Sequence, residues 1–223
     1  MGVFPPVEGR SGFPHAATGL HGSERAYHRF AESWCTAVEA VDPKAKGHSA
    51  RVGLYASALA ERVGIATEQL PWYRIGGLLH DVGKAIIPVT LLTKPGALTA
   101  AERREIERHP VVGAEMVEAL KWPFDLRPMV LYHHERWDGG GYPHGLARGT
   151  IPLSARIMAI ADVFDALTSE RPYRPAYSPR QAIAIMTADS GGAFDPQLFE
   201  AFREMMAPQI AQGKARLPER AIA

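Results

Sequence analysis

The chain has 223 residues, a formal net charge of +1, and 46% hydrophobic and 22% charged residues, a composition typical of a globular protein with a buried core. A charge so close to zero gives no reason to expect binding to a nucleic-acid polymer or a membrane surface. Cys35 is the single cysteine, which excludes an intramolecular disulfide and a cysteine-based zinc site, so that any metal must be held by histidines and carboxylates.

The ends of the sequence differ from its middle. Two prolines interrupt the first ten residues, where a secretory signal would need an apolar stretch, and no apolar run approaches the roughly 18 residues of a membrane-spanning helix. We therefore expect a cytoplasmic protein. Residues 1–23 are rich in Gly, Pro, Ser and His without periodicity, which predicts a flexible leader. A single domain is expected over 24–207, followed by a short tail at 208–223.

The middle of the sequence predicts helices and little else. Apolar residues recur at helical spacing, and pairs such as Thr99 with Glu102 mark capped helix starts. The expected helices cover 23–41, 48–63, 67–82 (with Thr67 as the cap) and 153–167, and others begin near 99, 123, 178 and 195. No alternating run flanked by hairpin turns is present. The expected fold is an all-α, single-domain helical bundle.

Histidines and aspartates lie within or beside these predicted helices. His80 follows the apolar stretch 75–79 and precedes Asp81, and His133 is expected on the apolar face of the helix that begins near residue 123. Asp162 lies within the apolar segment 157–164, where a bare carboxylate would be costly to bury. A metal ion or an arginine partner would offset that cost, and an isolated helix histidine is usually only hydrogen-bonded. The combination favours a metal site between helices, as helical bundles commonly build.

Two further segments carry polar groups that suit a nucleotide. Gly139–Gly141 forms a loop that either approaches a ligand closely or makes a surface turn, and Tyr142 beside it is suited to stacking on a base. Arg171 and Arg174 follow the helix that carries Asp162. Two guanidinium groups there would grip a phosphate, unless they simply face solvent at the end of the helix.

At this point the chain resembles a known family. His80-Asp81, with Gly83 and Lys84, resembles the signature of the HD superfamily of phosphohydrolases. The later Gly141-Tyr142-Pro143 segment makes the sequence similar to the HD-GYP family of cyclic di-GMP phosphodiesterases, over a match running from about residue 42 to 196. The resemblance implies a helical bundle of the HD-domain type.

The resemblance also implies roles for individual residues. The metal ligands would be His48, His80, Asp81, His109, His133, His134 and Asp162. Asp81 would bridge two ions, and Lys84 would lie beside the metals and the scissile phosphate as a second catalytic residue. The substrate-binding residues would be Arg171, Arg174, Tyr142, Gly141, Pro143 and Asp165. Lys44 stands where some members carry a glutamate that binds a third metal, so two ions are expected.

The expected activity follows from that site. Two divalent ions, iron or manganese with zinc as the alternative, would activate a hydroxide that hydrolyses cyclic di-GMP to linear pGpG, to GMP or to both. Three alternatives stay open: a nucleotide phosphohydrolase of another HD type, a non-catalytic signalling module that binds a cyclic dinucleotide or a partner, and a structural helical protein with incidental histidines. A signalling protein or a second copy of the chain is the expected protein partner.

Overall fold

The structure, a computed structural model, describes residues 20–42, 46–170, 175–214 and 217. Regular structure in these residues is helical throughout, and no strand occurs among them, only an isolated bridge between Ser190 and Phe194. The all-α prediction is therefore confirmed. The helices are α1 (Leu20–Val41), α2 (His48–Arg62), α3 (Leu70–Leu79), α4 (Val89–Leu92), α5 (Ala100–Ile106), α6 (His109–Glu118), α7 (Arg127–Leu131), α8 (Leu153–Thr168), α9 (Pro179–Ala188) and α10 (Pro196–Ala211), with 3-10 turns η2 (Thr67–Gln69), η3 (Val82–Ile86) and η4 (Arg148–Thr150).

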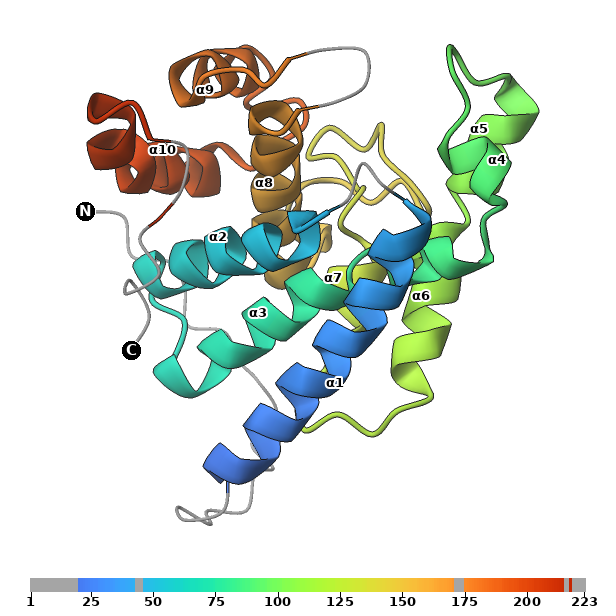
Figure 1. The fold of residues 1–223 in the computed structure, drawn as a ribbon. Coiled ribbons are helices and arrows are strands. Elements are labelled where there is room, and N and C mark those ends of the chain that lie inside the picture. The colour runs from blue at the N-terminus through green and yellow to red at the C-terminus, as the bar shows by residue number, and fades with distance from the viewer. Residues whose placement is uncertain (1–19, 43–45, 171–174, 215–216, 218–223) are drawn as a thin grey trace.

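Helices α2, α3 and α8 form the centre of the bundle (Figure 1). Helix α1 lies across α3 and η3, and α6 packs against α7 and η3. Helices α9 and α10 cover one end of α8, while α4 and α5 stand at the opposite side of the molecule. Every segment expected to carry a metal ligand therefore belongs to this centre or to the elements that pack on it.

Two glycines let α2 and α3 approach to backbone contact. A Cβ on Gly77 of α3 would collide with the backbone of Gly53 in α2, and a Cβ on Gly53 would lie 2.6 Å from the carbonyl oxygen of Arg74. Because both positions lack a side chain, the two helices run directly against each other. This contact brings His48, at the start of α2, close to His80, at the end of α3, with ring centroids 5.3 Å apart.

An aromatic cluster fixes α8 in the bundle. The ring of Phe164 in α8 packs edge-on against Tyr55 of α2 at 5.2 Å between centroids and against Phe202 of α10 at 5.1 Å. All three side chains are almost fully buried, and losing one such aromatic side chain typically costs about 3–5 kcal/mol of stability. The packing holds α8 in the position that aims Asp162 and Asp165 at α2.

Several predicted helix limits differ from the structure. The third helix ends at Leu79 rather than near Val82, because the chain tightens into η3, where Gly83 packs on the carbonyl of His109. Thr67 begins a 3-10 turn and does not cap it. Helix α7 ends at Leu131, so the prediction that His133 lies on its apolar face is wrong, and the histidine lies in the turn that follows.

Three of the helix starts read from capping residues are confirmed. Thr99 and Glu102 form a reciprocal capping box ahead of α5, and Ser178 and Gln181 do the same for α9. Asp195 accepts backbone hydrogen bonds at the start of α10.

The limits set for the domain stay a prediction. Helix α1 begins at Leu20 and α10 runs to Ala211, beyond the 24 and 207 expected, and most of the leader and tail lies outside the described residues. Within the described ranges, no helix combines the length and the apolar character that crossing a membrane requires.

Candidate metal centre

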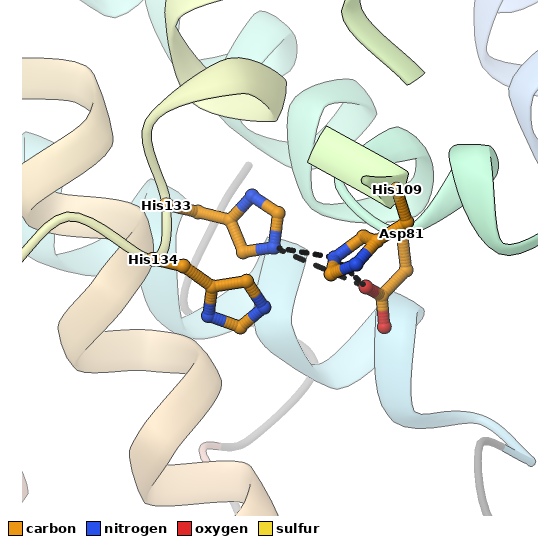
Figure 2. A group of neighbouring side chains, drawn as sticks. All are labelled: Asp81, His109, His133 and His134. Atoms are coloured by element: carbon orange, nitrogen blue, oxygen red, sulfur yellow. Dashed lines mark hydrogen bonds and ion pairs between the residues drawn. The ribbon is translucent and has the colours of Figure 1, made fainter. Parts of the chain in front are cut away.

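Seven side chains converge where α2, α3, α6 and α8 meet. They form two groups of potential ligand atoms, with the atoms of each group within 4.8 Å of one another: Asp81, His109, His133 and His134 in the first, and His48, His80 and Asp162 in the second. Figure 2 shows the first group, in which His133 and His134, from one turn of the chain, lie beside His109 and Asp81. These are the seven residues that the resemblance implied as metal ligands, now brought together by the fold.

Asp81 lies between the two groups. Its Oδ1 atom is 3.2 Å from Nε2 of His109 and 3.9 Å from Nε2 of His133, both in the first group. Its Oδ2 atom is 3.4 Å from Nε2 of His80, in the second group. One carboxylate therefore offers an oxygen to each group, which is the arrangement needed to bridge two ions.

Four of the five histidines have one ring nitrogen already engaged away from the centre. The Nδ1 atoms of His80, His109 and His133 lie 2.7–2.8 Å from the carbonyl oxygens of Gly77, Ile106 and Val130, each three residues earlier. Nδ1 of His48 lies 2.7 Å from Oδ2 of Asp165. Since an oxygen acceptor requires the proton on Nδ1, the Nε2 atom of each ring is left to face the centre.

Two features of the seven side chains suit the binding of metal ions. Among the described residues, the Nε2 atom of His80 is buried without a hydrogen-bond partner, a costly arrangement that a bound cation would relieve. The set also consists of imidazoles and carboxylates, which suit iron, manganese and zinc.

Burial and the neighbouring charges favour the ligating forms of most of these groups. Burial lowers the pKa of His134 to about 4 and lowers the pKa of His133 and His80, which keeps the rings neutral. Burial opposes ionisation of Asp81, yet Lys84 and His80 hold the pKa of that carboxyl well below its usual range.

His48 differs from the other histidines. Burial disfavours its charged form, but the carboxylates of Asp162, 3.1 Å from its Nε2 atom, and Asp165 raise its pKa to about 9. An ion bound at its Nε2 atom would take the place of a proton there.

Lys84 follows the His-Asp pair in η3 and contacts it. Its Nζ atom lies 2.5 Å from Oδ2 of Asp81, and the charges of Asp81 and Asp162 raise the pKa of its ammonium group despite burial. The sequence predicted Lys84 beside the metals. In the structure it supplies a positive charge at the edge of the cluster.

The carboxylate of Asp165 is buried and makes its hydrogen bonds to other side chains of the protein. Its side chain is 1% exposed, and it accepts hydrogen bonds from Nε of Arg51 at 2.6 Å and from Nη2 at 3.0 Å in addition to the bond with His48. Arg51 also donates to Oγ of Ser169. The geometry gives Asp165 a role in holding His48, and the substrate-binding role that the resemblance implied for it stays a prediction.

The loop that carries Gly141, Tyr142 and Pro143 folds back on the histidine pair. A Cβ on Gly141 would collide with the backbone of His134, Glu135 and Arg136. The Tyr142 amide donates to the carbonyl of His134, and the two rings lie 4.8 Å apart. Tyr142 therefore packs directly on one of the potential metal ligands.

Glu135 anchors the same loop, and sequence reasoning gave it no role. Its carboxylate is 3% exposed and accepts the backbone N–H groups of His144 at 2.7 Å and Leu146 at 3.0 Å. Arg51 was missed as well. The only signal for either residue was its place in a motif, His-His-Glu-Arg or His-Ser-Ala-Arg-Val, since both act through long-range contacts.

Three residues from the sequence analysis lie outside the described residues: Arg171, Arg174 and Lys44. Their expected roles at the phosphates and against a third metal stay predictions.

Comparison with known proteins gives the family. A family model described as HD domain matches residues 35–198. The cyclic di-GMP phosphodiesterase response regulator RpfG of Xanthomonas campestris is 38% identical over 185 residues, covering 82% of this chain and 47% of the relative. A cyclic di-GMP phosphodiesterase of Pseudomonas aeruginosa is 44% identical over 156 residues, covering 70% and 37%. A 3'3'-cGAMP-specific phosphodiesterase of Vibrio cholerae is 39% identical over 170 residues, covering 76% and 37%.

The solved structures agree in fold. An HDG"Y"P protein from Bdellovibrio bacteriovorus superposes with a TM-score of 0.63 at 20% identity, covering 84% of this chain and 63% of that one. A cyclic GMP-AMP specific phosphodiesterase of Vibrio cholerae gives a TM-score of 0.67 at 19% identity, covering 87% and 52%. The chain spans less than half the length of the three curated relatives above. It belongs to the HD domain family, and within it to the HD-GYP group that the sequence motifs predicted.

Proposed function

We propose that the chain is a metal-dependent phosphodiesterase that hydrolyses a cyclic dinucleotide, with cyclic di-GMP as the expected substrate. The observation that carries the proposal is the position of Asp81 between two groups of histidine and aspartate donors. A structural protein has no need of five imidazoles around a buried carboxylate, an arrangement that is costly unless ions bind there.

The proposed ligands are the seven residues of the two groups. His109, His133 and His134 would hold one ion and His48, His80 and Asp162 the other, with Asp81 shared between them. Two divalent ions in adjacent sites supply activation of a water molecule and neutralisation of phosphate charge. Iron or manganese is the expected metal, with zinc as the alternative.

The protein's own side chains would do the rest. Lys84, within 2.5 Å of Asp81, would stabilise negative charge that develops on the phosphate, since a preorganised cation in a dry site acts strongly on a transition state. Arg171 and Arg174 would bind the phosphates bidentately. Tyr142, with Gly141 and Pro143, would form a wall of the substrate site next to His134.

The relatives support the substrate class but divide on the substrate. Two of the three compared above are named for cyclic di-GMP, and one for 3'3'-cGAMP. Both substrates are cyclic dinucleotides with two phosphodiester bonds, so the same metal chemistry serves either. The cytoplasmic setting and a signalling partner or second copy stay predictions from the sequence.

The experiment is metal analysis and product chromatography on anaerobically purified protein. About two equivalents of iron or manganese and conversion of cyclic di-GMP to pGpG or GMP are expected, with 3'3'-cGAMP tested in parallel. The Asp81→Ala protein should lose metal and about 10²–10³-fold or more of the turnover, while Asp125→Ala, an exposed acid outside the cluster, should keep both. Full metal occupancy without turnover of any cyclic dinucleotide would contradict the proposal and indicate a binding module.

A further inference from the structure

Helix α2 begins without a cap of its own. Its N-cap residue is Gly47, which has a φ of 68° and no side chain to accept a hydrogen bond. The first amides of an α-helix have no partner within the helix and need an acceptor from elsewhere. In α2 this open end matters, because His48 is its first residue.

Glu39, in the last turns of α1, supplies the missing acceptor. Its Oε2 atom accepts the N–H of Gly47 at 2.7 Å, and its Oε1 atom accepts the N–H of Ser49 at 3.4 Å. The two contacts lie on either side of His48 in the chain. A negative carboxylate at a helix N-terminus is also favoured by the helix dipole.

The Glu39 contacts complete the restraints on His48. Asp165 fixes the imidazole through Nδ1 and leaves Nε2 directed at Asp162, 3.1 Å away. Asp165 determines how the ring is turned, but the position of the ring depends on where the first residue of α2 lies. Glu39 fixes that position from a different helix.

We propose that Glu39 is a positioning residue for the metal group formed by His48, His80 and Asp162, so that α1 is part of the metal site and not only a cover for the core. This inference rests on the proposed metal function. It predicts an unequal effect: loss of Glu39 should weaken the ion bound by the His48 group more than the ion bound by the His109 group, because both backbone hydrogen bonds of Glu39 go to the start of α2. A cap that serves only stability would leave both affinities unchanged.

The test is titration of the metal-free full chain with Mn²⁺, with free Mn²⁺ measured by electron paramagnetic resonance. The variants are Glu39→Ala and Glu39→Gln, the latter keeping one acceptor oxygen but no charge. The control is Glu32→Gln, an exposed glutamate on the same helix whose near partner is His28 at 3.5 Å. Circular dichroism and the thermal midpoint of each metal-free protein are measured alongside.

The expected result is that Glu39→Ala weakens one of two Mn²⁺ equivalents about tenfold or more, as removal of groups that orient metal ligands typically does. Glu39→Gln should weaken the same equivalent by less, and Glu32→Gln should match the parent. If Glu39→Ala does not fold, Glu39→Gln carries the test. A lowered thermal midpoint with both equivalents unchanged, or equal weakening of both, would overturn the proposal. A parent protein that binds no Mn²⁺ would overturn the metal site itself, whereas Mn²⁺ binding without hydrolysis would contradict only the enzymatic function.

Discussion

At the scale of single residues, the orientation of four histidine rings is set by the ring nitrogen that faces away from the cluster. His80, His109 and His133 direct Nδ1 at a backbone carbonyl, which needs only local structure. His48 instead uses a carboxylate on α8, Asp165. The His48 ring therefore depends on packing between two helices, and we expect it to be the potential ligand most sensitive to substitutions outside the cluster.

Replacement of Asp165 tests this dependence. Asp165→Asn keeps the size of the side chain but loses the charge that Arg51 and His48 share, so His48 should be held less firmly. We expect metal affinity to fall about 10–100-fold, as measured by competition with a chelator. Asp125→Asn, at an exposed loop position, is the matched control. An unchanged affinity in Asp165→Asn would return Asp165 to the substrate-binding role that the sequence suggested.

Replacement of Lys84 separates charge stabilisation from metal binding. Because Lys84 contacts Asp81 but offers no lone pair while charged, Lys84→Met should retain both metal equivalents and lose about 10²–10³-fold in kcat. Metal analysis and steady-state kinetics on cyclic di-GMP measure the two effects. Lys94→Met, at a partly exposed lysine that pairs with Glu102, should behave as the parent. Loss of metal together with activity would mean that Lys84 acts by holding Asp81.

At the scale of elements, the Gly141 loop is defined by close backbone contact. A Cβ on Gly141 would collide with backbone atoms of residues 134–136, which cannot move aside as a side chain would. Gly141→Ala should therefore lower the free energy of unfolding by about 1–3 kcal/mol, measured by urea denaturation. It should also weaken metal binding, because Tyr142 would shift off His134. Gly149→Ala is the control, since its Cβ would have no atom within 4 Å, and a Gly141→Ala protein as stable as this control would contradict the argument.

Three capped helix starts were readable from the sequence, whereas the ends of α3 and α7 were not. Thr99, Ser178 and Asp195 cap the helices that follow them through hydrogen bonds to residues two or three positions away, so a local pattern suffices. The ends of α3 and α7 depend on distant contacts, such as Gly83 against α6. A histidine side chain also takes over a backbone carbonyl at each of these ends, which apolar periodicity does not reveal.

At the scale of the whole molecule, the cluster of potential metal ligands joins segments that are far apart in the chain. The motifs identified every member of the two donor groups, because the chemistry of each residue type is local. The pairing of Glu39 with α2 and the contact between Arg51 and Asp165, 114 residues apart, required the fold. Spacing alone did not separate Asp162 from Asp165, since both lie on one face of α8, and the resemblance was needed to assign Asp162 to the donor groups.

Because the proposed ligands come from five segments, ion binding should stabilise the whole domain. A ligand that binds only the folded state adds about 2.7 kcal/mol at a concentration 100 times its dissociation constant, which for a chain of this size corresponds to a rise of about 5–10 °C in the thermal midpoint. We expect that rise when Mn²⁺ is added to metal-free protein and its reversal by excess chelator, both followed by circular dichroism. The Asp81→Ala protein should respond little, because it lacks the oxygen atoms shared by both groups. An equal rise in parent and variant would show that Mn²⁺ stabilises the protein from elsewhere and would remove the cluster as its site.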